Sequence, residues 1–135
     1  MSDRNPGDLH CGMPRCDIWM RAIAMPADTN PHGQIFGGWL MSQMDLAGGT
    51  CANRRAKGTV STVAVDSMTF HQPVFVGDQL TCYCDILKVG RTSIGVRVEA
   101  WVRRFNSDEV VKVTEGVYTY VAIDENRRPR PVPSE

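Results

Sequence analysis

The sequence lacks a charge bias, a long apolar run and an apolar leader, and each absence excludes a class of protein. Fifteen Lys and Arg balance fifteen Asp and Glu among 135 residues, whereas a dedicated duplex-DNA binder usually carries a clear basic excess. No apolar run approaches the roughly 20 residues that a membrane span requires. The first residues, MSDRNPGDLHCGMPRC, have no apolar centre of the kind that marks a secretory signal. We therefore expect a cytoplasmic protein with no nucleic-acid partner and no stable membrane insertion.

The sequence also lacks an even number of cysteines. The five cysteines are Cys11, Cys16, Cys51, Cys82 and Cys84. Without an apolar leader, this number favours free thiols in a reducing compartment over a disulfide framework. Cys82 and Cys84 share one face of an expected strand, but a closed zinc site needs about four ligands, and no second pair stands at a suitable spacing. We expect cysteines that are buried as small apolar side chains, and no metal site.

The composition fits one folded domain flanked by two short segments. Apolar residues make up 42% of the chain and charged residues 22%, which is typical of a globular protein. Residues 1–13 combine charges with Pro and Gly, so we expect a flexible leader. Residues 125–135 contain Pro129, Pro131 and Pro133 among arginines, which predicts a tail that neither extends a helix nor pairs as a central strand. The domain is expected over residues 14–124.

Hydrophobic periodicity predicts one helix and five strands within that domain. The helix is expected at residues 37–55, and it is apolar nearly all round, which is typical of a buried helix. The strands are expected at residues 18–24, 60–70, 80–89, 94–102 and 111–121. Four consecutive strands after the helix favour an α+β fold in which a meandering antiparallel sheet curves around the helix.

Asp45 is the first candidate for chemistry because it interrupts a helix face that is otherwise apolar or small. Such a carboxylate either lies at a crevice, where it can act as an acid or base, or is an ordinary charge at the solvent boundary. Gly37 and Gly38 open the helix, where amides without side chains can bind a carbonyl or phosphate oxygen, or simply form a tight turn. About 10 Å of helical rise separates Gly38 from Asp45, so a long groove or a partner subunit would have to bridge them.

Three further residues are weaker candidates. Asn30 and His32 precede the helix and could orient water or donate to a carbonyl, although Asn-Pro is also a common start of a turn. Asp66 shares the face of Thr62 and Met68 in an expected strand, so we expect it to point inward.

A basic cluster surrounds Gly90, where one expected strand ends and the next begins. It consists of Lys88, Arg91, Thr92 and Ser93. An arginine with two hydroxyls and turn amides suits a phosphate group. A solvated hairpin has the same composition, so the cluster alone does not decide between the two interpretations.

Residues 28–45, DTNPHGQIFGGWLMSQMD, resemble the signature of the hotdog-fold acyl-CoA thioesterases, in particular the small bacterial YciA-type acyl-CoA thioester hydrolases. Residues 62–70, 73–78 and 88–94 extend the resemblance in the same order, so that it covers residues 13–124. The resemblance implies a hotdog fold, in which a curved antiparallel sheet wraps a long central helix. It also implies hydrolysis of acyl-CoA to a free carboxylic acid and CoA.

The resemblance further implies roles for individual residues. It matches the catalytic aspartate to Asp45, and it matches the asparagine that completes the site from the other subunit to Asn30. Gly37 and Gly38 match the amides that polarise the thioester carbonyl. The residues expected to contact the substrate and its CoA phosphates are Arg91, Thr92, Ser93, Lys88, Ser67 and Phe70. Family members commonly assemble as trimers of dimers, so we expect at least a homodimer and, beyond it, a homohexamer.

The implied chemistry leaves two mechanisms open. Asp45 could activate water as a general base, or it could attack the carbonyl and form a mixed anhydride. Neither mechanism calls for a cofactor, because coenzyme A is part of substrate and product. The acyl chain needs an apolar slot, for which the candidates are Trp39, Met44, Met68 and Phe70.

Two other functions remain as alternatives. A non-catalytic hotdog module could bind acyl-CoA as a sensor, but it would not need Asp45. A hotdog hydratase or dehydratase usually needs an Asp/His pair, for which His32 and His71 are the available histidines.

Overall fold

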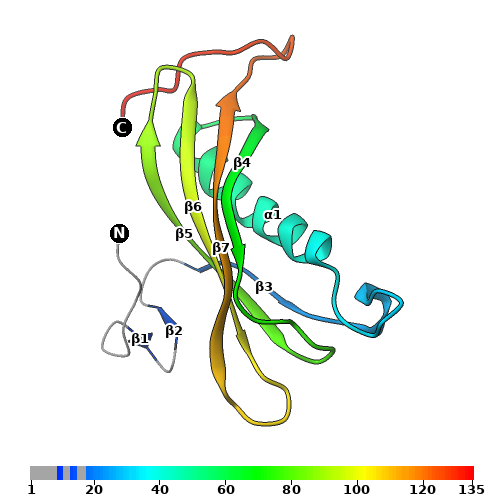
Figure 1. The fold of residues 1–135 in the computed structure, drawn as a ribbon. Coiled ribbons are helices and arrows are strands. Elements are labelled where there is room, and N and C mark those ends of the chain that lie inside the picture. Colours follow the sequence, from blue (N-terminus) through cyan, green and yellow to red (C-terminus); the bar gives the residue numbers. More distant parts are fainter. Residues whose placement is uncertain (1–8, 11–12, 15–17) are drawn as a thin grey trace.

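A curved antiparallel sheet with one long helix against its face forms the body of the protein (Figure 1). The computed structural model describes residues 9–10, 13–14 and 18–135. Its elements are β1 (Leu9–His10), β2 (Met13–Pro14), β3 (Ile18–Ile23), the 3₁₀ turn η2 (Pro26–Asp28), α1 (Gly37–Ala56), β4 (Val60–Phe70), β5 (Gln79–Val89), β6 (Ser93–Arg103) and β7 (Val110–Ala122). Most of the expected leader, together with Cys11 and Cys16, lies outside the described residues.

The helix and the five long strands are confirmed, and each expected end lies within one residue of the observed one. The clearest case is β6, where apolar and polar residues alternate and Ile94, Val96 and Val98 are fully buried. This agreement follows because a period of two specifies a strand with one face toward the core.

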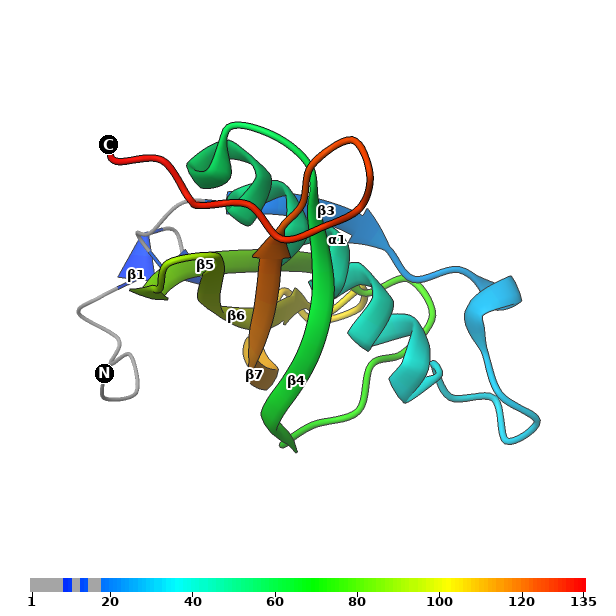
Figure 2. The ribbon, with the colours of Figure 1, turned by 90° about the horizontal axis from the view of Figure 1, so that it is seen from above.

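The expected meander of four strands is wrong for β4. The strand order in the sheet is β3-β5-β6-β7-β4, so β4 pairs with β7 rather than with β5. The residues between β4 and β5 do not form a hairpin but cross below the start of the helix, where Ile35 N donates to Val74 O at 3.3 Å. As a result β3 and β4 form the two edges of the sheet, and the helix lies between them (Figure 2).

The helix is buried on one face only, which corrects the expectation that it is buried all round. Its buried residues are Leu40, Met44, Ala47, Gly48, Cys51, Ala52 and Ala56. On the opposite face Leu46 is 60% exposed, and Thr50 and Asn53 are exposed as well. The physical reason is that the sheet of a single chain curves around only one side of the helix.

Residues 125–135 lie against the end of the helix, on the side of the molecule that Figure 2 presents. Arg130 Nη2 donates to the carbonyl oxygen of Ala56 at 3.0 Å, and Arg55 Nη1 donates to that of Pro133 at 2.7 Å. Val132 N donates to Arg91 O at 2.8 Å, which joins this segment to the turn between β5 and β6. The contact with Ala56 satisfies a carbonyl group at the helix end that has no partner inside the helix.

The expectation that the cysteines are buried can be tested for three of the five, and it is confirmed for these three. Cys51, Cys82 and Cys84 are buried and form no disulfide bond. Burial raises the pKa of the Cys82 thiol to about 12. A hydrogen bond with Cys51, together with burial, raises the pKa of Cys84. In the part of the chain that the structure describes, no helix is long and apolar enough to cross a bilayer.

Candidate active site

Asp45 lies half-buried on α1, on the side of the helix that faces the edge strand β4. Its Oδ1 atom accepts hydrogen bonds from Thr62 Oγ1 at 2.8 Å and from Tyr120 Oη at 3.0 Å. Within residues 18–135, Oδ2 accepts no hydrogen bond and forms no ion pair. The carboxylate is therefore held through one oxygen, while the other remains available.

Two clefts meet at Asp45. The larger has a volume of about 370 Å³ and runs between the helix and β4 from Asp45 past Asn53 to Thr59. The smaller, of about 220 Å³, lies on the other side of Asp45, between Met41 and Val65. The position of Asp45 is thus a crevice, which was one of the two interpretations that the sequence allowed.

Thr62 and Tyr120 were not identified as site residues from the sequence. Burial, the negative charge of Asp45 and the hydrogen bond to it raise the pKa of the Tyr120 phenol, so the hydroxyl remains a proton donor. The sequence feature that could have identified Tyr120 is the alternation in β7, which places Tyr118 and Tyr120 on the inner face of that strand. A buried tyrosine hydroxyl requires a hydrogen-bond partner, and the helix opposite supplies it.

The start of α1 forms a second region of interest. No side chain caps this end, and the first amide of the helix to bond a carbonyl one turn earlier is Leu40 N, which donates to Phe36 O at 3.2 Å. A Cβ added at Gly38 would meet nothing within 4 Å, and one added at Gly37 would lie 3.7 Å from the Phe70 ring. The amides of both glycines are thus open to an approaching oxygen atom.

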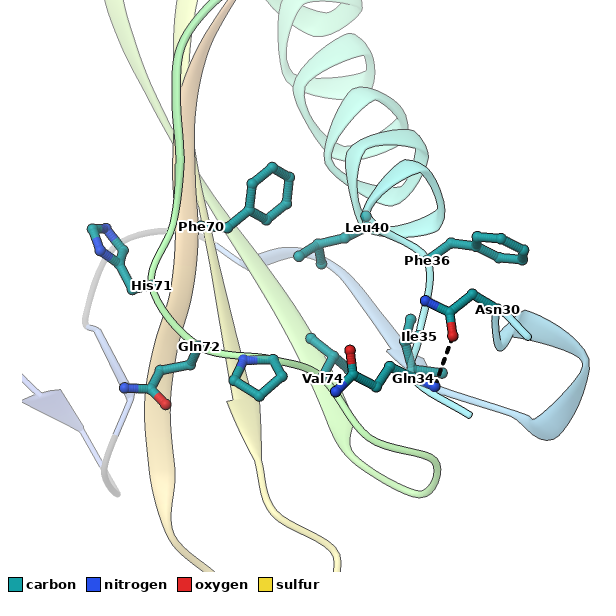
Figure 3. Close-up of a pocket in the computed structure, with 11 residues that line it drawn as sticks. Asn30, Gln34, Ile35, Phe36, Leu40, Phe70, His71, Gln72 and Val74 are labelled. Carbon is teal, nitrogen blue, oxygen red and sulfur yellow. Dashed lines mark hydrogen bonds between the residues drawn. The ribbon is translucent and has the colours of Figure 1, made fainter. Parts of the chain in front are cut away.

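A cleft of about 400 Å³ lies beside these amides (Figure 3). Its lining includes Asn30, Gly37, Phe70 and His71. Phe70 is 49% exposed, because it lies at the end of the edge strand β4. One predicted substrate residue therefore lies beside two of the predicted catalytic residues.

Asn30 forms the turn that its sequence context suggests, and it also faces the cleft. Its Oδ1 accepts hydrogen bonds from the backbone amides of His32 at 2.9 Å and Gln34 at 3.1 Å. Figure 3 shows the side-chain oxygen turned toward Gln34 and the nitrogen turned toward the start of the helix. The side-chain NH₂ group is thereby presented on a loop whose conformation its own oxygen fixes. His32 does not line this cleft.

Within one chain, Asn30 and the two glycines do not meet Asp45. Asn30 and Gly37 line the cleft at the helix start, whereas Asp45 lines the two clefts farther along the helix. The separation agrees with the roughly 10 Å of rise between Gly38 and Asp45 that the helix geometry gives. A reacting group that contacts all of them requires residues from a second chain.

The basic cluster forms the turn between β5 and β6. Gly90 N donates to Ser93 O at 2.7 Å, and Thr92 O accepts from Ala122 N at 2.8 Å. Arg91 and Lys88 are exposed. Ile123 directly follows Ala122, and its N atom donates to Thr59 O at 3.1 Å. Thr59 in turn lines the far end of the larger Asp45 cleft. The turn with Arg91, Thr92 and Ser93 is therefore at the end of the sheet toward which that cleft runs.

The remaining predictions in β4 have mixed outcomes. Ser67 has a positive φ of 57° and lies where the pairing of β4 with β7 shifts register between Asp66 and Thr69. Asp66 is exposed, so the expectation that it points inward is wrong, because another register shift, between Thr62 and Ala64, breaks the alternation of the strand before Asp66.

The predicted acyl slot is wrong for Met44, which is fully buried in the core. Trp39 and Met68 are partly buried and pack against that core. Phe70 lines the cleft at the helix start.

Among residues 18–135 of one chain, Asp45 pairs with no histidine, and its side-chain partners are Thr62 and Tyr120. His71 lines the cleft at the helix start instead. Among residues 9–10, 13–14 and 18–135, no three His, Cys, Asp or Glu side chains gather in a way that could hold a metal ion.

Comparison with known proteins yields consistent matches. Residues 32–104 match the family model described as the thioesterase superfamily. The acyl-CoA thioester hydrolase YciA of Escherichia coli is 46% identical over 126 residues, which cover 91% of this chain and 96% of that protein.

Two solved structures superpose with a TM-score of 0.86. One is the hexameric thioesterase y2039 from Yersinia pestis, which is 49% identical, with 91% of this chain and 100% of that chain covered. The other is a variant, with one aspartate replaced by alanine, of a hexameric acyl-coenzyme A thioesterase of broad specificity. It is 48% identical and covers 90% of this chain and 89% of its own.

Proposed function

Because this chain belongs to the thioesterase superfamily, we propose that it hydrolyses acyl-CoA to a free carboxylic acid and CoA, with Asp45 as the catalytic carboxylate. The family and the hotdog fold expected from the sequence are confirmed by the relatives and by the curved sheet around one helix. The observation that carries the proposal is the carboxylate of Asp45, held by Oδ1 at the junction of two clefts.

Two sequences of bond changes fit this carboxylate. As a general base, Asp45 accepts a proton from a water molecule whose oxygen attacks the thioester carbonyl carbon. The tetrahedral intermediate then breaks its C–S bond, and the proton passes to the leaving thiolate. As a nucleophile, Asp45 attacks the same carbon, CoA leaves, and water hydrolyses the mixed anhydride. Both routes develop negative charge on the carbonyl oxygen, and each well-placed donor there contributes about 3 to 4 kcal/mol.

The donors in this proposal are the amides of Gly37 and Gly38, and Asn30 contributes its NH₂ group. Since one chain keeps these groups apart from Asp45, the site forms between two subunits, with Asp45 from one and Asn30 from the other. The hexameric relatives support extending this to a homohexamer. Arg91, Thr92, Ser93 and Lys88 bind the CoA phosphates, and Ser67 and Phe70 contact the substrate near the helix start. Hydrolysis by water and a carboxylate needs no metal or redox cofactor.

A cytoplasmic location is part of the proposal. Acyl-CoA is an intracellular substrate class, and Cys51, Cys82 and Cys84 form no disulfide bond, which suits a reducing compartment.

The proposal is tested by following thiol release from short-, medium- and long-chain acyl-CoAs. Asp45→Asn should bind CoA like the wild type yet lose activity by a factor of about 10² to 10⁴, the usual contribution of a general base. Asp66→Asn, an exposed aspartate of β4, is the matched control and should retain activity. Binding of CoA by the wild type without thiol release would identify a binding module instead. With an enoyl-CoA as substrate, loss of the absorbance of its conjugated double bond without thiol release would identify a hydratase.

A further inference from the structure

Tyr120 contacts Asp45 at two points. Its hydroxyl lies 3.0 Å from Asp45 Oδ1 and 3.1 Å from the backbone oxygen of the same residue. Tyr120 is part of the wall of the larger cleft, but it is only 1% exposed, and its hydroxyl is engaged with Asp45. A single hydroxyl that contacts both the main chain and the carboxylate of one residue fixes the orientation of that side chain.

Gly48 makes this contact possible. It lies one helical turn after Asp45, and a Cβ at this position would lie 2.5 Å from Tyr120 Oη and 3.0 Å from Val98 Cγ2. Any side chain here would push the phenol away from the helix. The missing side chain of Gly48 therefore provides the space through which Tyr120 reaches Asp45.

Tyr118 offers an internal comparison. Its ring is stacked on that of Tyr120, with centroids 6.3 Å apart, and its hydroxyl donates to Met41 O at 2.8 Å. Both tyrosines thus join β7 to the helix, but only Tyr120 also contacts a carboxylate. The two tyrosines therefore have similar roles in packing, but only Tyr120 is placed to affect the chemistry of Asp45.

We infer that Tyr120 is the positioning residue for Asp45: it holds the carboxylate through Oδ1 so that Oδ2 is the oxygen that takes the proton from water or attacks the thioester. The inference rests on the proposed function of Asp45. Thr62 Oγ1 donates to the same Oδ1, so both side-chain hydrogen bonds use one oxygen of a carboxylate that lines the two clefts. The raised pKa of Tyr120, caused by burial and by the nearby Asp45 charge, keeps its hydroxyl protonated while the enzyme works.

Tyr120→Phe removes the hydroxyl and keeps the ring. Since a hydrogen bond to a charged group is worth about 1.5 to 3 kcal/mol, we expect kcat to fall about tenfold or more. KM should change little, because Tyr120 is only 1% exposed and its hydroxyl is engaged with Asp45. The acid limb of the pH profile of kcat/KM should move to higher pH, because the donated hydrogen bond favours the ionised carboxylate. Tyr118→Phe is the matched control and should leave the position of that limb unchanged.

A second variant removes the same contact from the helix side. Gly48→Ala displaces the hydroxyl but keeps the phenol, and it should move the acid limb in the same direction as Tyr120→Phe. Gly48→Ala replaces Tyr120→Phe in the test if circular dichroism or gel filtration shows that Tyr120→Phe does not fold and assemble.

The outcomes separate the inference from the proposed function. Full activity in Asp45→Asn would overturn both. An inactive Asp45→Asn together with a folded Tyr120→Phe of wild-type kcat and pH profile would overturn the inference alone. An equal shift of the acid limb in Tyr118→Phe would also overturn it, because the effect would then come from helix packing.

Discussion

Thr62 and Tyr120 are opposite each other in the register of β4 and β7, and both donate a hydrogen bond to Oδ1 of Asp45. One pair of facing strand residues therefore holds one carboxylate oxygen. Because β4 is an edge strand, this arrangement connects the position of Asp45 to the edge of the sheet.

The first prediction concerns Thr62. Thr62→Val keeps the shape of the side chain but loses the donor, so kcat for thiol release should fall about tenfold, as expected for one hydrogen bond to a charged group. Thr62→Ser restores a hydroxyl and should recover most of the activity. Steady-state kinetics on one acyl-CoA checks both variants, and equal rates for Thr62→Val and wild type would contradict the prediction.

The elements of this fold were predictable because their periodicities are strong. Residues 94–102 alternate cleanly, and the helix carries apolar residues at spacings of three and four, so each element follows from local sequence alone. The position of β4 in the sheet was not predictable in this way. Periodicity identifies a strand and its buried face, but it does not specify which other strand it pairs with.

A site residue could be predicted where its polarity differs from that of the other residues on the same face of its helix or strand. Asp45 could be identified because it is charged on an apolar face of the helix. Met44 was assigned wrongly to a substrate slot, since an apolar residue in the core and one that lines a cleft look the same in sequence. Tyr120 could not be assigned to Asp45, because the contact depends on which residue of the helix lies opposite it, and this is set by the packing of helix on sheet.

The second prediction concerns the sharing of a site between subunits. Asn30→Asp keeps an oxygen that can accept the turn hydrogen bonds from His32 and Gln34, but it loses the NH₂ donors, so it should be nearly inactive. Asp45→Asn should be inactive as well. When the two variants exchange subunits at equal concentrations, half of the dimers are hybrids, and each contains one intact site. We expect recovery of about a quarter of wild-type activity, as the two-fold symmetry of a dimer requires.

Subunit exchange can be confirmed by mass spectrometry of differently tagged chains. No recovery of activity in confirmed hybrids would mean that Asn30 and Asp45 act within the same chain, and full activity of Asn30→Asp alone would mean that Asn30 does not act at all.

The third prediction concerns the nucleotide end of the substrate. Arg91 is exposed on the turn between β5 and β6, and its guanidinium can bind a phosphate group through paired hydrogen bonds. Arg91→Gln should raise KM for acyl-CoA about tenfold with little change in kcat, consistent with one lost charge-assisted hydrogen bond. Arg128→Gln, an exposed arginine in residues 125–135, is the matched control.

A truncated substrate isolates this effect. An acyl thioester of N-acetylcysteamine has no nucleotide, so wild type and Arg91→Gln should hydrolyse it with the same kcat/KM. A loss of activity on this substrate would assign Arg91 a structural role instead.

The last prediction concerns the buried thiols. The thiolate is the reactive form of cysteine, and burial raises the pKa of Cys82 from 9.0 to about 12. In a variant with Cys11→Ser and Cys16→Ser, the native protein should therefore not react with a thiol reagent at pH 8, whereas the denatured protein should react at Cys51, Cys82 and Cys84. The free energy of unfolding should also fall as pH rises from about 9 toward 12, because only the unfolded chain ionises its thiols in that range. Fast labelling of the native variant, or unfolding that does not depend on pH above 9, would contradict the burial of these residues.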